Sequence, residues 1–299
     1  MPTPRRTTFD PTRRRLLLAS AGSLALAACG GGGGSTASPA STTTTTVGPQ
    51  RLSLLRVFAL EQPAGVALRL PLAFADAEGV PTADVPDDIT VRAVSPSGAS
   101  LDPVTVARRG TGIPSPYFPF EQTLDETGTW ELVIAVGSAE TSTELTVRAP
   151  EELAAVPNPG DPLPSIPTPT VNDALGIEPL CTATPPCPLH EVSLDQALTS
   201  GLPTVLLVST PAFCQTAICG PVLDLLVERQ MRVGDRATLI HAEVYTDESL
   251  EETTPTVNAL GLRYEPSLFL ADADGTVRAR LDYTFDATEL DESLDALLA

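Results

Sequence analysis

The hydrophobic pattern of residues 51–149 has a period of two. Apolar and polar side chains alternate in short runs, among them 66–70, 89–94, 130–136 and 144–147. Turn-forming sequences such as Pro96-Ser97-Gly98 separate these runs. The alternation predicts strands with one buried face, and about seven such strands in about 100 residues are typical of an antiparallel β-sandwich. We therefore expect a sandwich over 51–149.

Residues 179–299 follow a different pattern, in which continuous apolar runs are separated by helical segments. The runs 204–208 and 238–245 have the apolar character of buried strands in a mixed sheet. Two further strands, 267–271 and 276–283, flank an Asp-Gly turn and predict a hairpin.

Helices are expected around these strands. Residues 221–233 carry apolar side chains at helical spacing. Ser193 opens a short helix and Asp286 opens the last one, both in capping-box sequences, while Thr254 precedes a helix with Pro at its first position. The resulting order, α-β-α-β-α-β-β-α, is that of a mixed α/β fold.

Two segments contain few large apolar side chains that could form a hydrophobic core. Residues 29–50 consist mainly of Gly, Ser, Thr and Ala, which predicts a flexible tether. Residues 150–178 contain prolines at near-alternate spacing, which favours an extended, semi-rigid linker. The boundary between two domains, 51–149 and 179–299, is expected in this linker.

The first 28 residues have the features of an export signal. A basic stretch that includes Arg13 and Arg14 precedes a short apolar run, 16–28. This run is too short for a spanning helix, and the arginine pair resembles a twin-arginine signal. Leu26-Ala27-Ala28-Cys29 resembles a bacterial lipobox, which implies removal of residues 1–28 and lipidation of Cys29. The expected location is extracytoplasmic, lipid-anchored to the cell membrane; the alternative is a plain secretory peptide with an incidental Cys.

The charge of the chain argues against one class of partner. It has 38 acidic and 18 basic residues, a net charge of −20, and five of the arginines lie within the first 15 residues. The sequence has no basic patch with interleaved aromatic residues. Because a surface of this sign repels phosphate, we expect no nucleic-acid partner.

The residues most suited to catalysis lie in the C-terminal region. The strand 204–208 leads to Phe213-Cys214, and Cys219-Gly220-Pro221 follows after four intervening residues. Tyr264-Glu265-Pro266 stands just before the predicted hairpin. These two motifs resemble those of the thioredoxin superfamily. More loosely, residues 117–132 resemble immunoglobulin-like bacterial modules.

The thioredoxin resemblance implies a redox site in which Cys214 and Cys219 act beside a cis-Pro266. It implies no cofactor and no metal. The implied partners are protein thiols or disulfides of exported proteins and an unknown redox partner. Thioredoxins also bury an acid six positions before the first Cys, where this chain has Val208, so we expect no helper for proton transfer to the second thiol.

The cysteine spacing departs from the C-x2-C of thioredoxins. Cα atoms five positions apart in a regular helix are about 8.5 Å apart, whereas a disulfide requires less than about 7 Å. Cys214 and Cys219 can therefore bond only if Cys214 precedes the regular helix or its first turn unwinds. We expect Cys214 at the helix start as the nucleophile and Cys219 one turn further in as the resolving thiol. Alignment of Cys219-Gly220-Pro221 with the Cys-Gly-Pro of thioredoxin predicts the opposite order.

Cys181 and Cys187 form a second pair across a proline-containing loop. His190 follows three residues after Cys187, but no fourth ligand stands at zinc-site spacing. His241 lies in a predicted apolar strand, where a lone His is more often a core residue than a ligand. We therefore expect a structural disulfide between Cys181 and Cys187.

Three functions fit these motifs. The favoured one is a membrane-tethered thiol–disulfide oxidoreductase, in which Cys214 attacks, Cys219 resolves, and the backbone before Pro266 pairs with the substrate chain. The second is a non-catalytic thioredoxin-fold adaptor stabilised by two disulfides. The third is a thiol peroxidase, because the bacterioferritin-comigratory peroxiredoxins also have a C-x4-C spacing.

Overall fold

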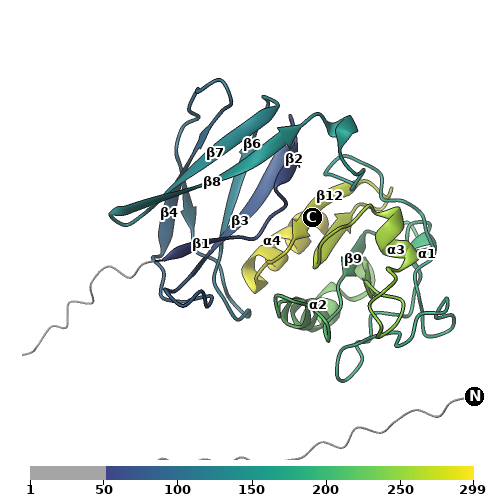
Figure 1. Ribbon diagram of the computed structural model, residues 1–299. Coiled ribbons are helices and arrows are strands. Elements are labelled where there is room, and N and C mark those ends of the chain that lie inside the picture. The colour runs from purple at the N-terminus through teal and green to yellow at the C-terminus, as the bar shows by residue number, and fades with distance from the viewer. Residues whose placement is uncertain (1–51) are drawn as a thin grey trace, which may run out of the picture. The chain divides into compact units, whose positions relative to one another are not determined.

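Residues 52–299 are described in this structure, a computed structural model (Figure 1). The predicted export signal with Arg13 and Arg14, the predicted lipidation site Cys29 and the tether 29–50 lie outside these residues. Within residues 52–299, no helix is both long and apolar enough to cross a membrane. The described chain forms three sheets and few helices.

Two of the sheets face each other across one hydrophobic core. The first has the strand order β1-β3-β6, with β1 at Ser53–Arg56, β3 at Ala67–Ala75 and β6 at Phe118–Thr123. The second has the order β2-β8-β7-β4-β5, with β2 at Glu61–Pro63, β8 at Ala139–Arg148, β7 at Gly128–Val136, β4 at Asp88–Val94 and β5 at Val104–Ala107. All neighbouring strands are antiparallel except β2 and β8.

The core between these sheets follows the period-two pattern. Inward-facing residues of both sheets form one cluster, which includes Phe74, Ile89, Phe118, Phe120, Trp130 and Leu132. Trp130 is buried, and its Nε1 donates to the carbonyl of Glu126 at 2.7 Å. The predicted sandwich is therefore present, and Trp130 belongs to its core.

The third sheet has the order β10-β9-β11-β12. Its strands are β9 (Thr204–Val208), β10 (Thr238–Ala242), β11 (Ser267–Ala271) and β12 (Val277–Asp282). Strand β10 is parallel to β9, while β11 is antiparallel to both β9 and β12. Four α-helices accompany the sheet: α1 (Leu194–Ala197), α2 (Cys219–Val233), α3 (Pro255–Ala259) and α4 (Ala287–Leu297), with a short 3-10 helix, η2 (Gly234–Arg236), after α2. The predicted order of α-helices and strands is confirmed.

Both faces of this sheet are covered, which explains its continuous apolar runs. Val205 and Leu207 of β9 pack in a core with residues of α2 and α4. Leu206 and Val208 pack in a second core with residues of α1 and α3. A strand between two apolar layers has no polar face, so it lacks the alternation seen in the sandwich.

Side chains cap two of the three helices whose starts were predicted from the sequence. The side chain of Thr254 accepts a bond from the backbone of α3, and that of Asp286 does the same for α4. The capping box at Ser193 is wrong, because its hydroxyl accepts from the backbone N–H of Thr168 at 2.8 Å instead. Thr168 in turn accepts from Leu194 N at 2.9 Å. The Pro-rich segment therefore supplies the cap of α1.

The segment 150–178 is in contact with the mixed sheet. It begins with a 3-10 helix, η1 (Pro150–Glu152). Gly160 and Leu163 then donate backbone hydrogen bonds to the carbonyls of Val277 and Gly275, both at 2.9 Å. Leu163 is buried in the core on that face. The segment is therefore packed along β12, whereas the proline pattern alone predicted a linker.

A buried ion pair joins the sandwich to α4. Arg69 of β3 lies 2.5 Å from Glu289, and both side chains are about nine-tenths buried. Tyr117 donates its hydroxyl to the same carboxylate. Arg69 also donates to the carbonyl of Thr284 at 2.6 Å. The carboxylate of Glu289 is thus satisfied entirely by residues of the sandwich.

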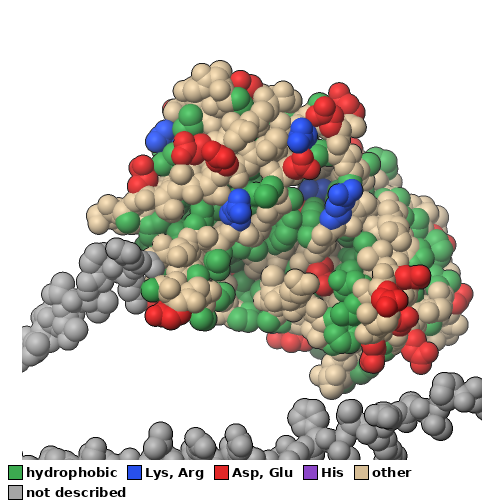
Figure 2. Space-filling model, in the orientation of Figure 1, with side chains coloured by type: hydrophobic (Ala, Val, Ile, Leu, Met, Phe, Trp, Pro, Cys, Tyr) green, Lys and Arg blue, Asp and Glu red, His purple; other side chains and the backbone are tan. Residues whose placement is uncertain are grey.

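Charged side chains are distributed over the face of the molecule that Figure 2 shows. Figure 2 shows acidic side chains at many separate places on one face, among polar and apolar side chains. The arginines on that face are fewer and do not form a continuous stripe. On the face shown, no single patch of positive or negative charge therefore dominates.

Candidate redox site and the second cysteine pair

The pairing of β9 with β11 places the predicted redox residues at one end of the sheet. Ser267, the first residue of β11, is opposite Val208, the last residue of β9. The loop that follows β9 therefore lies beside the residues that precede β11. That loop carries Cys214, and the residue pair before β11 is Glu265-Pro266, whose peptide bond is cis as the resemblance implied.

Cys214 and Cys219 are joined by a disulfide, with their Cα atoms 6.0 Å apart. Helix α2 begins at Cys219, so Cys214 precedes the regular helix and the geometric condition for the bond is met. The predicted helix start at Cys214 is wrong. Pro221 has no N–H to donate to the carbonyl of Ala217, and Ala217 has a left-handed φ of 55°. The helix consequently cannot extend back through Ala217.

The two sulfurs have different surroundings. Cys214 is partly exposed in the loop, with its Sγ 3.4 Å from the hydroxyl of Thr216. Cys219 is fully buried at the first position of α2, where unpaired backbone N–H groups favour a thiolate. The sequence predicted that Cys214 would be both accessible and stabilised as a thiolate by the helix start. In the structure these two properties belong to different residues: Cys214 is accessible, and Cys219 lies at the start of the helix.

A carboxyl group stands beside the buried sulfur. Glu265 Oε2 lies 3.4 Å from Cys219 Sγ and accepts the backbone N–H of Thr210 at 2.5 Å. Burial raises the pKa of Glu265 to about 7, with the bond from Thr210 opposing the shift and the charge of Glu243 adding to it. The expectation that no acid serves the second thiol is therefore corrected. Glu265 lies in the loop that precedes β11, and the only signal for it in the sequence was its position directly before Pro266.

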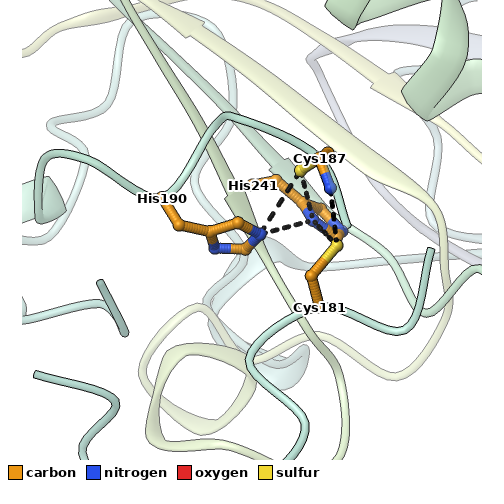
Figure 3. A group of neighbouring side chains, drawn as sticks. All are labelled: Cys181, Cys187, His190 and His241. Carbon is orange, nitrogen blue, oxygen red and sulfur yellow. Dashed lines mark hydrogen bonds between the residues drawn. The ribbon is translucent and has the colours of Figure 1, made fainter. Parts of the chain in front are cut away.

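Cys181 and Cys187 are free thiols, so the structural disulfide expected from the sequence is absent from the described structure. Instead the two sulfurs face both histidines of the chain (Figure 3). Cys187 Sγ lies 3.3 Å from His190 Nε2 and 3.4 Å from His241 Nδ1. Cys181 Sγ lies 3.8 Å from His241 Nδ1. The sequence did not reveal this cluster because His241, in β10, follows the other three residues by more than 50 positions and meets them only in the folded chain.

The second cysteine pair adjoins the loop that carries Cys214. Thr182, next to Cys181, donates its backbone N–H to the buried carboxyl of Glu243 at 2.7 Å. Its hydroxyl accepts the backbone N–H of Ala212 at 3.2 Å. His241 Nε2 lies 3.0 Å from the carbonyl of Ser209. The base of the loop that carries Cys214 is therefore held by residues of this cluster and its neighbours.

Comparison with known proteins gives weak likenesses of fold. No protein-family model and no curated protein matches the chain. A thioredoxin-family thiol:disulfide interchange protein from Chlorobium tepidum is similar over 48% of this chain and 98% of its own, at 16% identity and a TM-score of 0.32. The Lin-41 filamin domain is similar over 33% of this chain and 93% of its own, at 17% identity and a TM-score of 0.24.

A Salmonella alpha-2-macroglobulin is similar over 33% of this chain but only 6% of its own length, at 19% identity and a TM-score of 0.26. At identities and TM-scores this low, none of these likenesses carries an argument about function. We therefore infer the function from the geometry of the site.

Proposed function

We propose that this protein is an extracytoplasmic thiol–disulfide oxidoreductase tethered to the membrane by lipid on Cys29. In this proposal residues 179–299 form a thioredoxin-like domain and residues 51–149 an immunoglobulin-like domain. The observation that carries the proposal is the Cys214–Cys219 disulfide, which joins a partly exposed sulfur to a buried one beside the Glu265 carboxyl. A purely structural disulfide does not require a titratable group at one sulfur.

The proposed reaction moves two electrons by thiol–disulfide exchange. The Cys214 thiolate attacks one sulfur of a substrate disulfide, forms a mixed disulfide and releases the other substrate sulfur as a thiolate. Glu265 then accepts the proton of Cys219, and the Cys219 thiolate attacks Cys214 Sγ. This step forms the Cys214–Cys219 bond and releases the second substrate thiol. An extracytoplasmic dithiol donor reduces the bond again, and the same steps in reverse oxidise a substrate dithiol.

The other site residues position the reactants. Glu265 accepts the N–H of Thr210, which fixes its carboxylate between the loop and α2. Pro266 is buried and directly precedes β11, so the backbone at Glu265 lies at the end of the sheet next to the disulfide. We assign this backbone to pairing with the substrate chain, as expected from the resemblance.

The test is reduction of insulin by the purified full-length protein with a dithiol donor. We expect catalysed precipitation of the insulin B chain, abolished in Cys214→Ser. In Cys219→Ser we expect a trapped mixed disulfide at Cys214. Activity unchanged in Cys214→Ser would contradict the proposal.

The reduction potential separates an enzyme from the adaptor alternative. We expect the Cys214–Cys219 couple to be more oxidising than about −300 mV, the upper range of structural disulfides. Thiol trapping in buffers of defined potential measures it. A bond that stays oxidised below that value would favour the adaptor.

A further inference from the structure

The four residues Cys181, Cys187, His190 and His241 converge on one point. His190 and His241 are the only two histidines of the chain, and the cysteines are two of its five. One ligand atom from each residue lies within 4.8 Å of the other three. Cys181, His190 and His241 are buried and Cys187 is half-buried. The four side chains point into the same space from the loop that precedes α1 and from strand β10 (Figure 3).

Four of the six separations between the ligand atoms match a tetrahedral metal centre. With Zn–S near 2.3 Å and Zn–N near 2.0–2.1 Å, a tetrahedron has edges of about 3.3–3.8 Å. The two Cys187–imidazole edges are 3.3 and 3.4 Å, and the Cys181–His241 edge is 3.8 Å. The edge between His190 Nε2 and His241 Nδ1 is 3.3 Å. All four of these distances fall within the range for one zinc ion.

The imidazole rings are oriented for coordination. His241 Nε2 lies 3.0 Å from the carbonyl of Ser209, a contact that requires the ring proton on Nε2 and leaves the Nδ1 lone pair facing the cluster. The Nδ1 atom of His190 has no hydrogen-bond partner among residues 52–299. The only polar contacts of the His190 ring are therefore those that Nε2 makes within the cluster.

The sulfurs are placed to act as thiolate ligands. Cys181 Sγ accepts the backbone N–H of Cys187 at 3.3 Å. A backbone donor at Cys181 favours the thiolate form that a metal requires. Two thiolates, two neutral imidazoles and one divalent cation sum to zero charge, which suits a buried location.

We propose that Cys181, Cys187, His190 and His241 bind one zinc ion as a closed structural centre. A tetrahedral set of two sulfurs and two nitrogens selects zinc among the common divalent metals, and four protein ligands leave no open position for substrate. The ion stabilises the loop before α1 against β10. Through Ser209 and Thr182 it also supports the base of the loop that carries Cys214.

The first experiment is metal analysis of the purified full-length protein produced with added zinc. We expect one zinc per chain, no zinc in Cys181→Ser or His241→Ala, and one zinc in Cys214→Ser, the matched control from the other cysteine pair. Loss of zinc only in Cys214→Ser would place the metal at the redox site and overturn the proposal. Metal-free protein with a Cys181–Cys187 disulfide, seen as a mass two hydrogens lower, would overturn it as well.

A second measurement on the wild-type protein remains decisive if those variants fail to fold. Cobalt substitution should give the intense visible absorption of a tetrahedral site together with sulfur-to-metal charge transfer. Alkylation should label Cys181 and Cys187 only after a chelator is added. Labelling at equal rates with and without chelator, or a cobalt spectrum without charge transfer, would contradict the proposal. Neither result bears on the redox activity proposed for Cys214 and Cys219.

Discussion

Glu265 Oε2 lies 3.4 Å from Cys219 Sγ, although 46 residues separate them along the chain. Glu265 precedes β11 and Cys219 begins α2, so the contact depends on the antiparallel pairing of β11 with β9. In the mechanism proposed above, this carboxyl group accepts the proton of Cys219 once the disulfide is reduced.

Glu265→Gln should slow the resolving step and change its pH dependence. Burial raises the pKa of Glu265 to about 7, so its carboxylate form, which accepts the Cys219 proton, predominates only above that pH. The rate of attack by Cys219 should therefore rise through pH 7 in the wild-type protein. In Glu265→Gln this inflection should disappear and the rate above it should fall about 10²-fold.

Reaction of the reduced protein with an aromatic disulfide reagent measures this step. The first released thiol reports attack by one Cys, and the second reports closure by the other. Glu248→Gln, an exposed acid, is the control and should behave as wild type. An unchanged second phase in Glu265→Gln would remove Glu265 from the mechanism.

Cys214 should react first with external reagents. It is partly exposed, whereas Cys219 is fully buried, and alkylation requires access of the reagent to sulfur. After reduction, limiting iodoacetamide at neutral pH followed by peptide mapping should find label mainly on Cys214. Preferential labelling of Cys219 would show that its place at the start of α2 outweighs access and would reverse the assigned roles.

Glu289→Ala should destabilise the protein strongly. The substitution leaves the nine-tenths-buried Arg69 without its partner and the Tyr117 hydroxyl without its acceptor, a loss of about 3–5 kcal/mol for a broken buried pair. Glu292→Ala on the same helix is the matched control. Glu292 is exposed and its partner Arg109 is half-buried, so this pair contributes about 0–1 kcal/mol. Urea unfolding of both variants gives the comparison, and equal losses would contradict a special role for Glu289.

Chelation should lower the thermal unfolding midpoint of the wild-type protein. A metal that binds the folded chain and not the unfolded chain stabilises the folded state by mass action. We expect Cys214→Ser to respond to the chelator as wild type does and His241→Ala to show no response. Differential scanning fluorimetry with zinc added back is the measurement. A midpoint that is insensitive to chelator in wild type would show that no metal contributes to stability.

Local patterns in the sequence determined most of the secondary structure. The alternating runs predicted the strands of the sandwich, and the apolar run 204–208 coincides with β9. Thr254 and Asp286 mark helix starts because capping is a contact within one turn. The condition for the Cys214–Cys219 bond also followed from chain geometry alone, since it depends on only five residues.

The tertiary structure alone decided which distant side chains meet. Nothing local to His241 distinguishes a core residue from a ligand. The packing of the loop before α1 against β10, where His241 donates its backbone N–H to the carbonyl of Leu189 at 2.9 Å, brings its ring to Cys181, Cys187 and His190. Glu265 likewise replaces the acid missing at Val208, because the pairing of β11 with β9 places the loop before β11 beside the loop after β9. Sequence patterns report the faces of helices and strands, whereas a site assembled from several elements depends on the strand order and register that packing selects.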